Sequence, residues 1–329
     1  MALNSYDAAL GAFLGACAGD AAGATLEFKS SISASKLASA LAMEGGGVWK
    51  TAPGQITDDG ELTVSLAHAL TEATDGLSAI NKSAIWYLRW VQSSPFDIGT
   101  TTRASLGSPR AYESIARGMK EAAAENCMNS KSNGSLMRAV PLAIWGHKLA
   151  ASDLGALVKA DCTLSHPNPA VVSADIAYVM AIAHLLRHPG DRQGAWLVVE
   201  SYGARSDCDK ETQKWIQQAK DEKWEPAQPQ IGFVKIAFVN AFIHLRRSSN
   251  YLTAITETLK MGGDTDTNAC ITGGLIGAAV GVDNIPLHMR KAVLECDTSQ
   301  GKQPRPDWLS TKQIPALVAR LLTNAPSEY

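Results

Sequence analysis

The sequence predicts an all-α fold that forms one compact domain over residues 1–329. Apolar residues recur at helical spacing along most of the chain. There is no clear run of period-two alternation and no Asn-Gly hairpin signal between apolar strands. The length of 329 residues allows two average domains, but one large domain is also permitted. Because no linker-like stretch interrupts the helices, we expect a single domain.

Glycines at four-residue spacing mark two of the expected helices. They are Gly11, Gly15, Gly19 and Gly23 near the N-terminus, and Gly273, Gly277 and Gly281 near the other end. Small residues on one helical face let another backbone approach closely. We therefore expect two buried helices, about residues 6–19 and 273–281, that touch each other or a common neighbour and bring the two ends of the chain together.

The other helices follow from apolar periodicity and from capping and breaking residues. One is expected at 58–70, with Thr57 as its N-cap and with Asp58 and Asp59 in its first turn. Residues 45–54 and 95–102 are expected to be loops, and the polar stretch 203–231 to be surface helix and loop. Further helices are expected at 78–92, 109–125, 152–164, 170–186, 232–247, 250–260 and 311–323, and 29–44 is compatible with another.

Composition restricts the class of protein. Thirty basic and thirty-two acidic side chains leave a net charge of -2, which argues against nucleic-acid binding. The six scattered cysteines include no Cys-x-x-Cys pair and suit free thiols in a reducing cytosol. The apolar run 8–18 lacks a preceding basic residue, and no run reaches the roughly eighteen apolar residues that span a bilayer. We expect a cytoplasmic monomer that neither spans nor binds a membrane.

Two acidic clusters are the candidate functional residues of the sequence. One is Gly262 to Ala269, with the sequence Gly-Gly-Asp-Thr-Asp-Thr-Asn-Ala, and the other is Thr57-Asp58-Asp59. Carboxylate and hydroxyl ligands without His or Cys suit Mg²⁺, Mn²⁺ or Ca²⁺. An EF-hand is excluded, because its sixth and twelfth positions would be Ala269 and Leu275 instead of Gly and Glu. Helix capping alone is the alternative for either cluster, but two such clusters favour a metal site.

The hypothesis requires the two clusters to converge in space. Four converging carboxylates repel one another, and divalent cations are the usual remedy. A pair of such ions can bind vicinal hydroxyls, polarise a reacting centre and hold a hydroxide. The residues therefore indicate hydrolysis of a sugar or phosphate derivative, and this interpretation fails if the clusters lie far apart.

Five motifs, in chain order, resemble those of the ADP-ribosylglycohydrolase family. They are Gly19-Asp20-Ala21-Ala22-Gly23 with Glu27-Phe28, Thr57-Asp58-Asp59, Asn133 to Arg138 with Pro141, Ser165-His166, and Gly263 to Asn268. The similarity looks greatest to the branch of bacterial dinitrogenase reductase-activating glycohydrolases and ADP-ribosylarginine hydrolases. It implies an orthogonal all-α domain with two Mg²⁺ or Mn²⁺ ions that hydrolyses the glycosidic bond between ADP-ribose and an acceptor by a metal-activated water.

The resemblance also implies roles for individual residues. Glu27 would be a mobile-loop carboxylate, and Asp97 would face the guanidinium of an arginine acceptor. The metal ligands would be Thr57, Asp58, Asp59, Asp264, Asp266 and Thr267. The ADP-ribose cleft would be lined by Asp97, Gly99, Thr100, Asn133, Gly134, Ser135, Met137 and His166. The catalytic set would be Glu27, Asp59, Asp97, Asp264 and Asp266, with the carboxylate that orients the water left open among Asp59, Asp264 and Asp266.

Some of these residues have plainer interpretations. Asn133 to Ser135, expected at a helix start, would suit a pyrophosphate through backbone N–H groups or would simply cap the helix. His166 could be only a turn histidine before Pro167, and Arg138 could bind phosphate or pair with a buried Asp. Gly60 departs from the family, in which many members have Thr, and this departure affects the tuning of a metal rather than its ligation.

The leading hypothesis is a hydrolase that removes ADP-ribose from mono-ADP-ribosylated arginine of a protein and releases ADP-ribose. One alternative is a hydrolase of serine-linked, nucleic-acid-linked or small-molecule ADP-ribose derivatives. Another is a relative that binds ADP-ribose without catalysis. The presence of all six implied metal ligands disfavours the last alternative.

Overall fold

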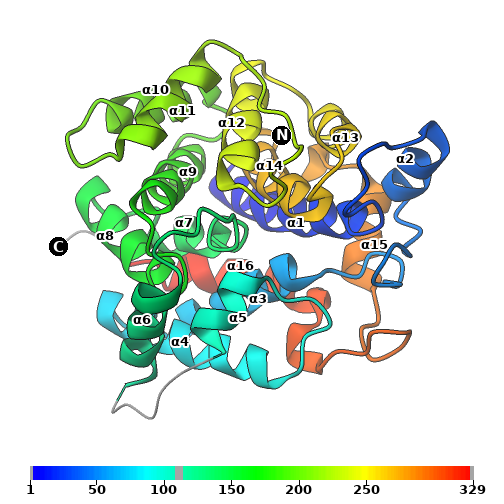
Figure 1. Cartoon of the computed structure of the whole chain (residues 1–329), viewed down its shortest axis with the longest axis horizontal. Helices are drawn as coiled ribbons and strands as arrows, with labels where there is room; N and C mark the ends of the chain where they lie inside the picture. The colour runs from blue at the N-terminus through cyan, green and yellow to red at the C-terminus, as the bar shows by residue number, and fades with distance from the viewer. Residues whose placement is uncertain (1–2, 108–113, 327–329) are drawn as a thin grey trace.

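A computed structural model describes residues 3–107 and 114–326 of the chain, and helices dominate both ranges. Within these ranges there is no β-strand, only two isolated bridges, between Gly46 and Thr51 and between Ser132 and Phe233. The all-α prediction is therefore confirmed. Figure 1 shows the helices crossing one another at many angles around the first and the fourteenth.

The helices have the following bounds. They are α1 (Ser5–Gly23), α2 (Ala34–Leu41), α3 (Asp58–Thr71), α4 (Gly76–Gln92), α5 (Thr100–Leu106), α6 (Ile115–Asn126), α7 (Val140–Gly146), α8 (Ala151–Cys162), α9 (Pro169–Arg187), α10 (Arg192–Gly203), α11 (Lys210–Lys220), α12 (Val234–Arg246), α13 (Tyr251–Lys260), α14 (Thr265–Val280), α15 (Leu287–Glu295) and α16 (Ile314–Thr323). Three short 3-10 helices are η1 (Val282–Asn284), η2 (Asp307–Leu309) and η3 (Thr311–Gln313).

Helices α1 and α14 form the centre of the molecule and pack along their glycine faces (Figure 1). A Cβ atom added at Gly15 would lie 2.3 Å from the Gly273 carbonyl oxygen, and one at Gly277 would lie 2.1 Å from that of Gly11. Any larger residue would force the backbones apart. The expectation that the two glycine-spaced helices touch is confirmed, and their contact brings the start of α14 to the end of α1.

Most of the other expected helices are present, with small shifts at their ends. Helix α2 covers only half of 29–44, and the helix expected at 109–125 begins at Ile115, with 109–113 outside the described residues. Helices α5, α7, α10 and α15 were not predicted, and α5 begins at Thr100, inside the stretch 95–102 that was expected to be a loop. In α10, Gly194 and Gly203 weaken the helical signal, and the start is fixed by the Asp191 side chain, which accepts a hydrogen bond from the Gly194 N–H.

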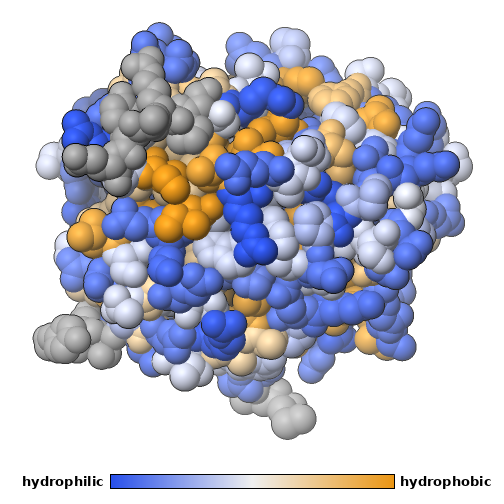
Figure 2. Space-filling model, turned by 90° about the horizontal axis from the view of Figure 1, so that it is seen from below, coloured by the Kyte–Doolittle hydropathy of each residue, from blue (hydrophilic) through white to orange (hydrophobic). Residues whose placement is uncertain are grey.

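Helix α9 (Pro169–Arg187) bears on the expectation about membrane-spanning segments. It is long and apolar enough to cross a bilayer, although no uninterrupted apolar run reaches that length; 89% of its apolar window is buried inside the protein, as in a core helix. Apolar side chains thus collect in the interior. Figure 2 shows hydrophilic residues over most of the face seen from below, around a smaller apolar patch.

Candidate active site

The first arm of the site is the start of α14, with Asp264, Asp266 and Thr267. It lies against the segment by which the chain leaves α1. The Phe28 N–H donates to the Gly263 carbonyl at 2.8 Å, and the Gly263 N–H donates to the Lys29 carbonyl at 2.9 Å. Gly262 and Gly263 have φ of 70° and 75°, which glycine adopts without strain. These contacts bring Glu27 beside Asp264 and Asp266, and one carboxylate oxygen from each of the three lies within 4.8 Å of the others.

The second arm is the start of α3, with Thr57, Asp58 and Asp59. The buried carboxylate of Asp20, at the end of α1, fixes its position. Thr57 occupies the N-cap position as predicted, but its side chain makes no capping hydrogen bond. Its hydroxyl instead donates to Asp20 Oδ1 at 2.8 Å. Asp20 also accepts the backbone N–H groups of Thr57 at 3.0 Å and Gly60 at 2.9 Å. The N-cap position of Thr57 is confirmed, but the side chain that accepts the Gly60 N–H of the first turn is Asp20.

The two arms meet. Thr267 Oγ1 lies 3.4 Å from Asp59 Oδ2, across 208 residues of sequence. Asp59 Oδ1 is buried and has no hydrogen-bond partner among the described residues. Asn133 joins the cluster from a third segment, since its Nδ2 donates to Asp264 Oδ2 at 2.7 Å. The condition that the clusters converge is met.

The electrostatics of this cluster are unfavourable without a cation. Burial, followed by neighbouring carboxylates, raises the pKa of Asp58, Asp59 and Asp266. Burial and the charge of Asp97 raise the pKa of Glu27 to about 8. Burial and the charge of Asp264 raise the pKa of Asp97 to about 7. Since carboxylate and hydroxyl oxygens are the ligands that Mg²⁺ and Mn²⁺ prefer, a divalent ion fits the donor set and would relieve the repulsion.

A cavity of about 450 Å³ opens above the two arms. The residues that line it include no lysine, arginine or histidine among those the structure describes. Its volume is within the range of small-molecule sites. The predicted residues that line it are Glu27, Asp58, Asp97, Gly99, Thr100, Asn133, Gly134, Met137, Asp264, Asp266 and Thr267. Thr57 and Asp59 are buried and do not line it.

Two residues assigned to the cleft, Ser135 and His166, are not in the cavity lining. His166 is fully buried behind Gly134, where an added Cβ would lie 3.0 Å from the imidazole Cε1. Its Nδ1 lies 2.7 Å from Ser165 Oγ, and its Nε2 lies 3.0 Å from Ser132 Oγ. Burial, with the nearby Arg138 charge, lowers the pKa of His166 to about 3. A neutral His166 thus supports the cavity wall from behind.

Residues 133–138 form turns rather than a helix start, since α7 begins only at Val140. Arg138 is fully buried within this segment. Its Nη1 donates to the Gly134 carbonyl at 3.0 Å, and its Nη2 lies 3.5 Å from Asp161. Of the two interpretations of Arg138, the structure supports the partner of a buried Asp, and the guanidinium holds the turn that carries Asn133 and Gly134.

Sequence reasoning missed several residues at this site. Asp20 belongs to the first family motif but was assigned no role. Its position between Gly19 and Ala21, in a run of small residues, indicates a buried carboxylate that needs hydrogen-bond donors. The cavity is also lined by Phe28, Trp49, Ile98, Thr101, Thr102, Ser132, Ile231 and Gly232. Trp49 lies in a segment that was recognised only as a glycine-rich loop.

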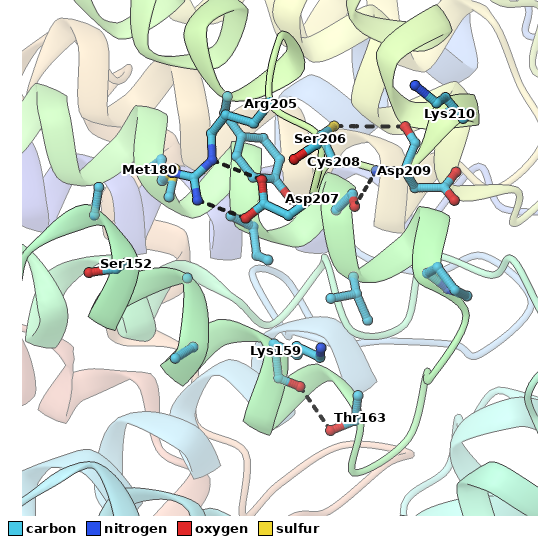
Figure 3. A pocket seen from close by; sticks show the side chains of 18 of the residues that line it. Ser152, Lys159, Thr163, Met180, Arg205, Ser206, Asp207, Cys208, Asp209 and Lys210 are labelled. Carbon is cyan, nitrogen blue, oxygen red and sulfur yellow. Dashed lines mark hydrogen bonds and ion pairs between the residues drawn. The ribbon is translucent and has the colours of Figure 1, made fainter.

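A second hollow, of about 640 Å³, lies between α8, α9 and the loop after α10 (Figure 3). Its two carboxylates are already engaged. Asp207 accepts two hydrogen bonds from Arg205, at 2.8 and 2.7 Å, and Asp209 accepts the Glu211 N–H at 2.8 Å. Among the described residues that line it, these two are the only acidic ones, so this hollow lacks the acidic cluster that distinguishes the cavity above α3 and α14.

Comparisons with known proteins agree with the motifs. The model of the ADP-ribosylglycohydrolase family matches residues 1–328. The ADP-ribosyl-[dinitrogen reductase] glycohydrolase of Rhodospirillum rubrum is 31% identical over 288 residues, which are 85% of this chain and 88% of the relative. The ADP-ribosylarginine hydrolase Tri1 of Serratia proteamaculans is 27% identical over 299 residues, 86% of this chain and 74% of the relative.

A solved structure shares the fold. It is described as an ADP-ribosylglycohydrolase-related protein complex, and it matches with a TM-score of 0.75 at 23% identity, over 98% of this chain and 99% of its own. The family match over nearly the whole chain, together with a relative of 31% identity, establishes the relationship. The chain therefore belongs to the ADP-ribosylglycohydrolase family of hydrolytic enzymes.

Proposed function

We propose that the protein removes ADP-ribose from mono-ADP-ribosylated arginine of a protein, in a reaction that depends on two Mg²⁺ or Mn²⁺ ions. The observation that carries this proposal is the approach of Thr267, which lines the cavity, to the buried Asp59, 3.4 Å apart, where no described cationic side chain lines the cavity. An ion bound there would compensate carboxylates that burial leaves unpaired. The names of the two relatives add support, since both refer to ADP-ribosyl substrates and one to arginine.

The residues that would hold the ions are those of the two arms. They are Thr57, Asp58 and Asp59 from the start of α3, with Asp264, Asp266 and Thr267 from the start of α14. Bound divalent ions would supply Lewis acidity and positive charge at the reacting centre. Asp20 stays behind the second arm and accepts the backbone N–H groups of Thr57 and Gly60, so it would orient ligands rather than bind an ion.

The carboxylates of the site also suit the cleavage itself. Breaking the bond at the anomeric carbon of ribose builds positive charge on the sugar, as in other glycosidic cleavages. Glu27 and the acidic groups of α14 face the cavity, where negative charge would stabilise that transition state. Asp97 lines the same cavity and would offer a carboxylate to the cationic guanidinium of the acceptor.

The direct test measures ADP-ribose release from an arginine-ADP-ribosylated protein. We expect release with Mg²⁺ or Mn²⁺ and none after chelation with EDTA. Absence of release with either metal would contradict the proposal. A serine-linked conjugate, assayed under the same conditions, separates acceptor specificity from general glycohydrolase activity, because faster turnover of that conjugate would favour the serine alternative.

A further inference from the structure

Trp49 lies at the cavity on the loop that joins α2 to α3. Gly46 and Thr51 exchange two backbone hydrogen bonds, at 2.8 and 3.0 Å, and these close a tight turn that contains Trp49. Gln303 Nε2 donates to the Trp49 carbonyl at 2.9 Å from the other side. A Cβ added at Gly47 would lie 2.5 Å from the Ala24 carbonyl oxygen. The turn is thus packed against the segment that leads from α1 to Glu27.

The indole of Trp49 contacts Glu27 directly. Its Nε1 donates to Glu27 Oε2 at 2.5 Å, across 22 residues of sequence. Glu27 lies close to Asp264 and Asp266, whose negative charges repel its own. No cationic side chain lines the cavity among the described residues. A neutral N–H donor therefore holds this carboxylate where electrostatic repulsion would otherwise displace it.

The ring of Trp49 provides a second feature. Trp49 and Asp97 line the same cavity. The Phe96 ring packs against the indole, with centroids 6.1 Å apart and planes tilted by 55°. An aromatic ring and a carboxylate that line one cavity match the chemistry of a guanidinium, which is planar, cationic and rich in donors. An uncharged acceptor hydroxyl would gain much less from such a wall.

We propose that Trp49 acts as a positioning and specificity residue, with its indole N–H holding Glu27 over the cavity and its ring contacting the guanidinium of an arginine acceptor beside Asp97. This inference rests on the proposed function. It assigns separate tasks to the two parts of one side chain, and substitutions that remove one part at a time can distinguish them.

The test compares Trp49→Phe, which keeps a ring but removes the donor, with Trp49→Leu, which removes both. The readouts are kcat and KM for an arginine-ADP-ribosylated protein, and the inhibition constant of free ADP-ribose, which lacks the guanidinium. Trp224→Phe is the matched control, since Trp224 is another half-buried loop tryptophan that contacts His244 and lies outside the cavity lining.

Trp49→Phe is expected to lower kcat roughly tenfold with little change in KM, because a hydrogen bond to a charged group is lost. Trp49→Leu is expected to lower kcat equally and to raise KM roughly fivefold, while the inhibition constant of ADP-ribose stays unchanged. Gln303→Ala keeps the indole but frees its loop, so a smaller fall in kcat is expected. Trp224→Phe should match the wild type in all three constants.

Wild-type kcat in Trp49→Phe would overturn the positioning role. A parallel rise of KM and of the ADP-ribose inhibition constant in Trp49→Leu would overturn the acceptor contact. These results differ from failure of the proposed function, in which the wild-type protein itself would release no ADP-ribose from the arginine conjugate. Circular dichroism of each variant shows whether the helices are retained, and Gln303→Ala tests the positioning role without altering the tryptophan.

Discussion

The first turn of α3 contains two kinds of buried acid, separated by one glycine. Glu61 is fully compensated: Arg305 donates to both of its carboxylate oxygens, at 2.7 and 3.0 Å, and the Trp90 indole donates at 2.7 Å. Asp59 is equally buried but has one oxygen with no partner among the described residues. Neither it nor Asp58 forms an ion pair with any described cationic side chain.

The difference separates an acid that supports the fold from acids available for chemistry. A buried carboxylate that is paired and hydrogen-bonded contributes to a fixed structure, whereas unpaired ones at a cavity are a liability unless a cation is bound. The unpaired carboxylates of the site therefore repel one another, and a bound cation would relieve this repulsion. Four predictions test this comparison.

The largest effect is expected from removal of an unpaired acid. Asp58→Ala or Asp264→Ala should lower kcat on the order of a thousandfold or more, since metal ligation is worth several kcal/mol, while the fold is retained. Asp75→Ala is the control, because Asp75 is an exposed acid that caps α4 through the Ser78 N–H and otherwise accepts a hydrogen bond from the Thr74 hydroxyl. It should reduce the free energy of unfolding by about 1 kcal/mol and leave kcat unchanged. Full activity in Asp58→Ala and Asp264→Ala would contradict the metal assignment.

Removal of the partner of the compensated acid should affect stability instead. Arg305→Met leaves the Glu61 carboxylate buried without its cation, and the free energy of unfolding should fall by about 3–5 kcal/mol. Urea denaturation followed by circular dichroism measures this. The double variant with Glu61→Met should recover part of the loss, because no buried charge then remains. A loss below about 1 kcal/mol in Arg305→Met would show that Glu61 does not depend on its ion pair.

Gly60 separates the two kinds of acid, and its replacement should have an intermediate effect. A Cβ there would lie 2.7 Å from Ile56 Cβ and 2.8 Å from Asp20 Oδ2. Gly60→Ala should therefore lower the free energy of unfolding by about 1–3 kcal/mol through overpacking. Gly76→Ala is the control in a helix with open space around it, and it should be neutral or slightly stabilising. Equal thermal midpoints for the two variants would refute the proposed crowding.

The last prediction concerns the pH dependence of stability in the absence of divalent ions. The pKa is raised to about 8 for Glu27 and to about 7 for Asp20 and Asp97, chiefly by burial. Between about pH 4 and pH 8 the folded state then binds more protons than the unfolded state, so stability should fall as pH rises through this range. Urea midpoints at pH 5 and pH 8 in EDTA measure the fall, and saturating Mn²⁺ should reduce it. Stability that rises with pH in EDTA would contradict these shifts.

The sequence by itself determined the helical fold class, most of the helices and the two acidic clusters. Periodicity placed most helices, and the glycine spacing of α1 and α14 predicted their contact, since small residues on one face have few other uses in a buried helix. The two acidic clusters and the family motifs indicated a metal-dependent hydrolase. These signals are local, because each depends on residue types within one or two helical turns.

Only the tertiary structure decided which acids are compensated and which are not. Glu61 and Arg305 are 244 residues apart, and nothing in the turn Asp58-Asp59-Gly60-Glu61 distinguishes the paired acid from the unpaired ones. The same holds for Asp20, which fixes the start of α3 from the end of α1, and for His166, which lies behind the cavity wall. Charge compensation depends on distances between side chains from different helices, and helix packing sets those distances.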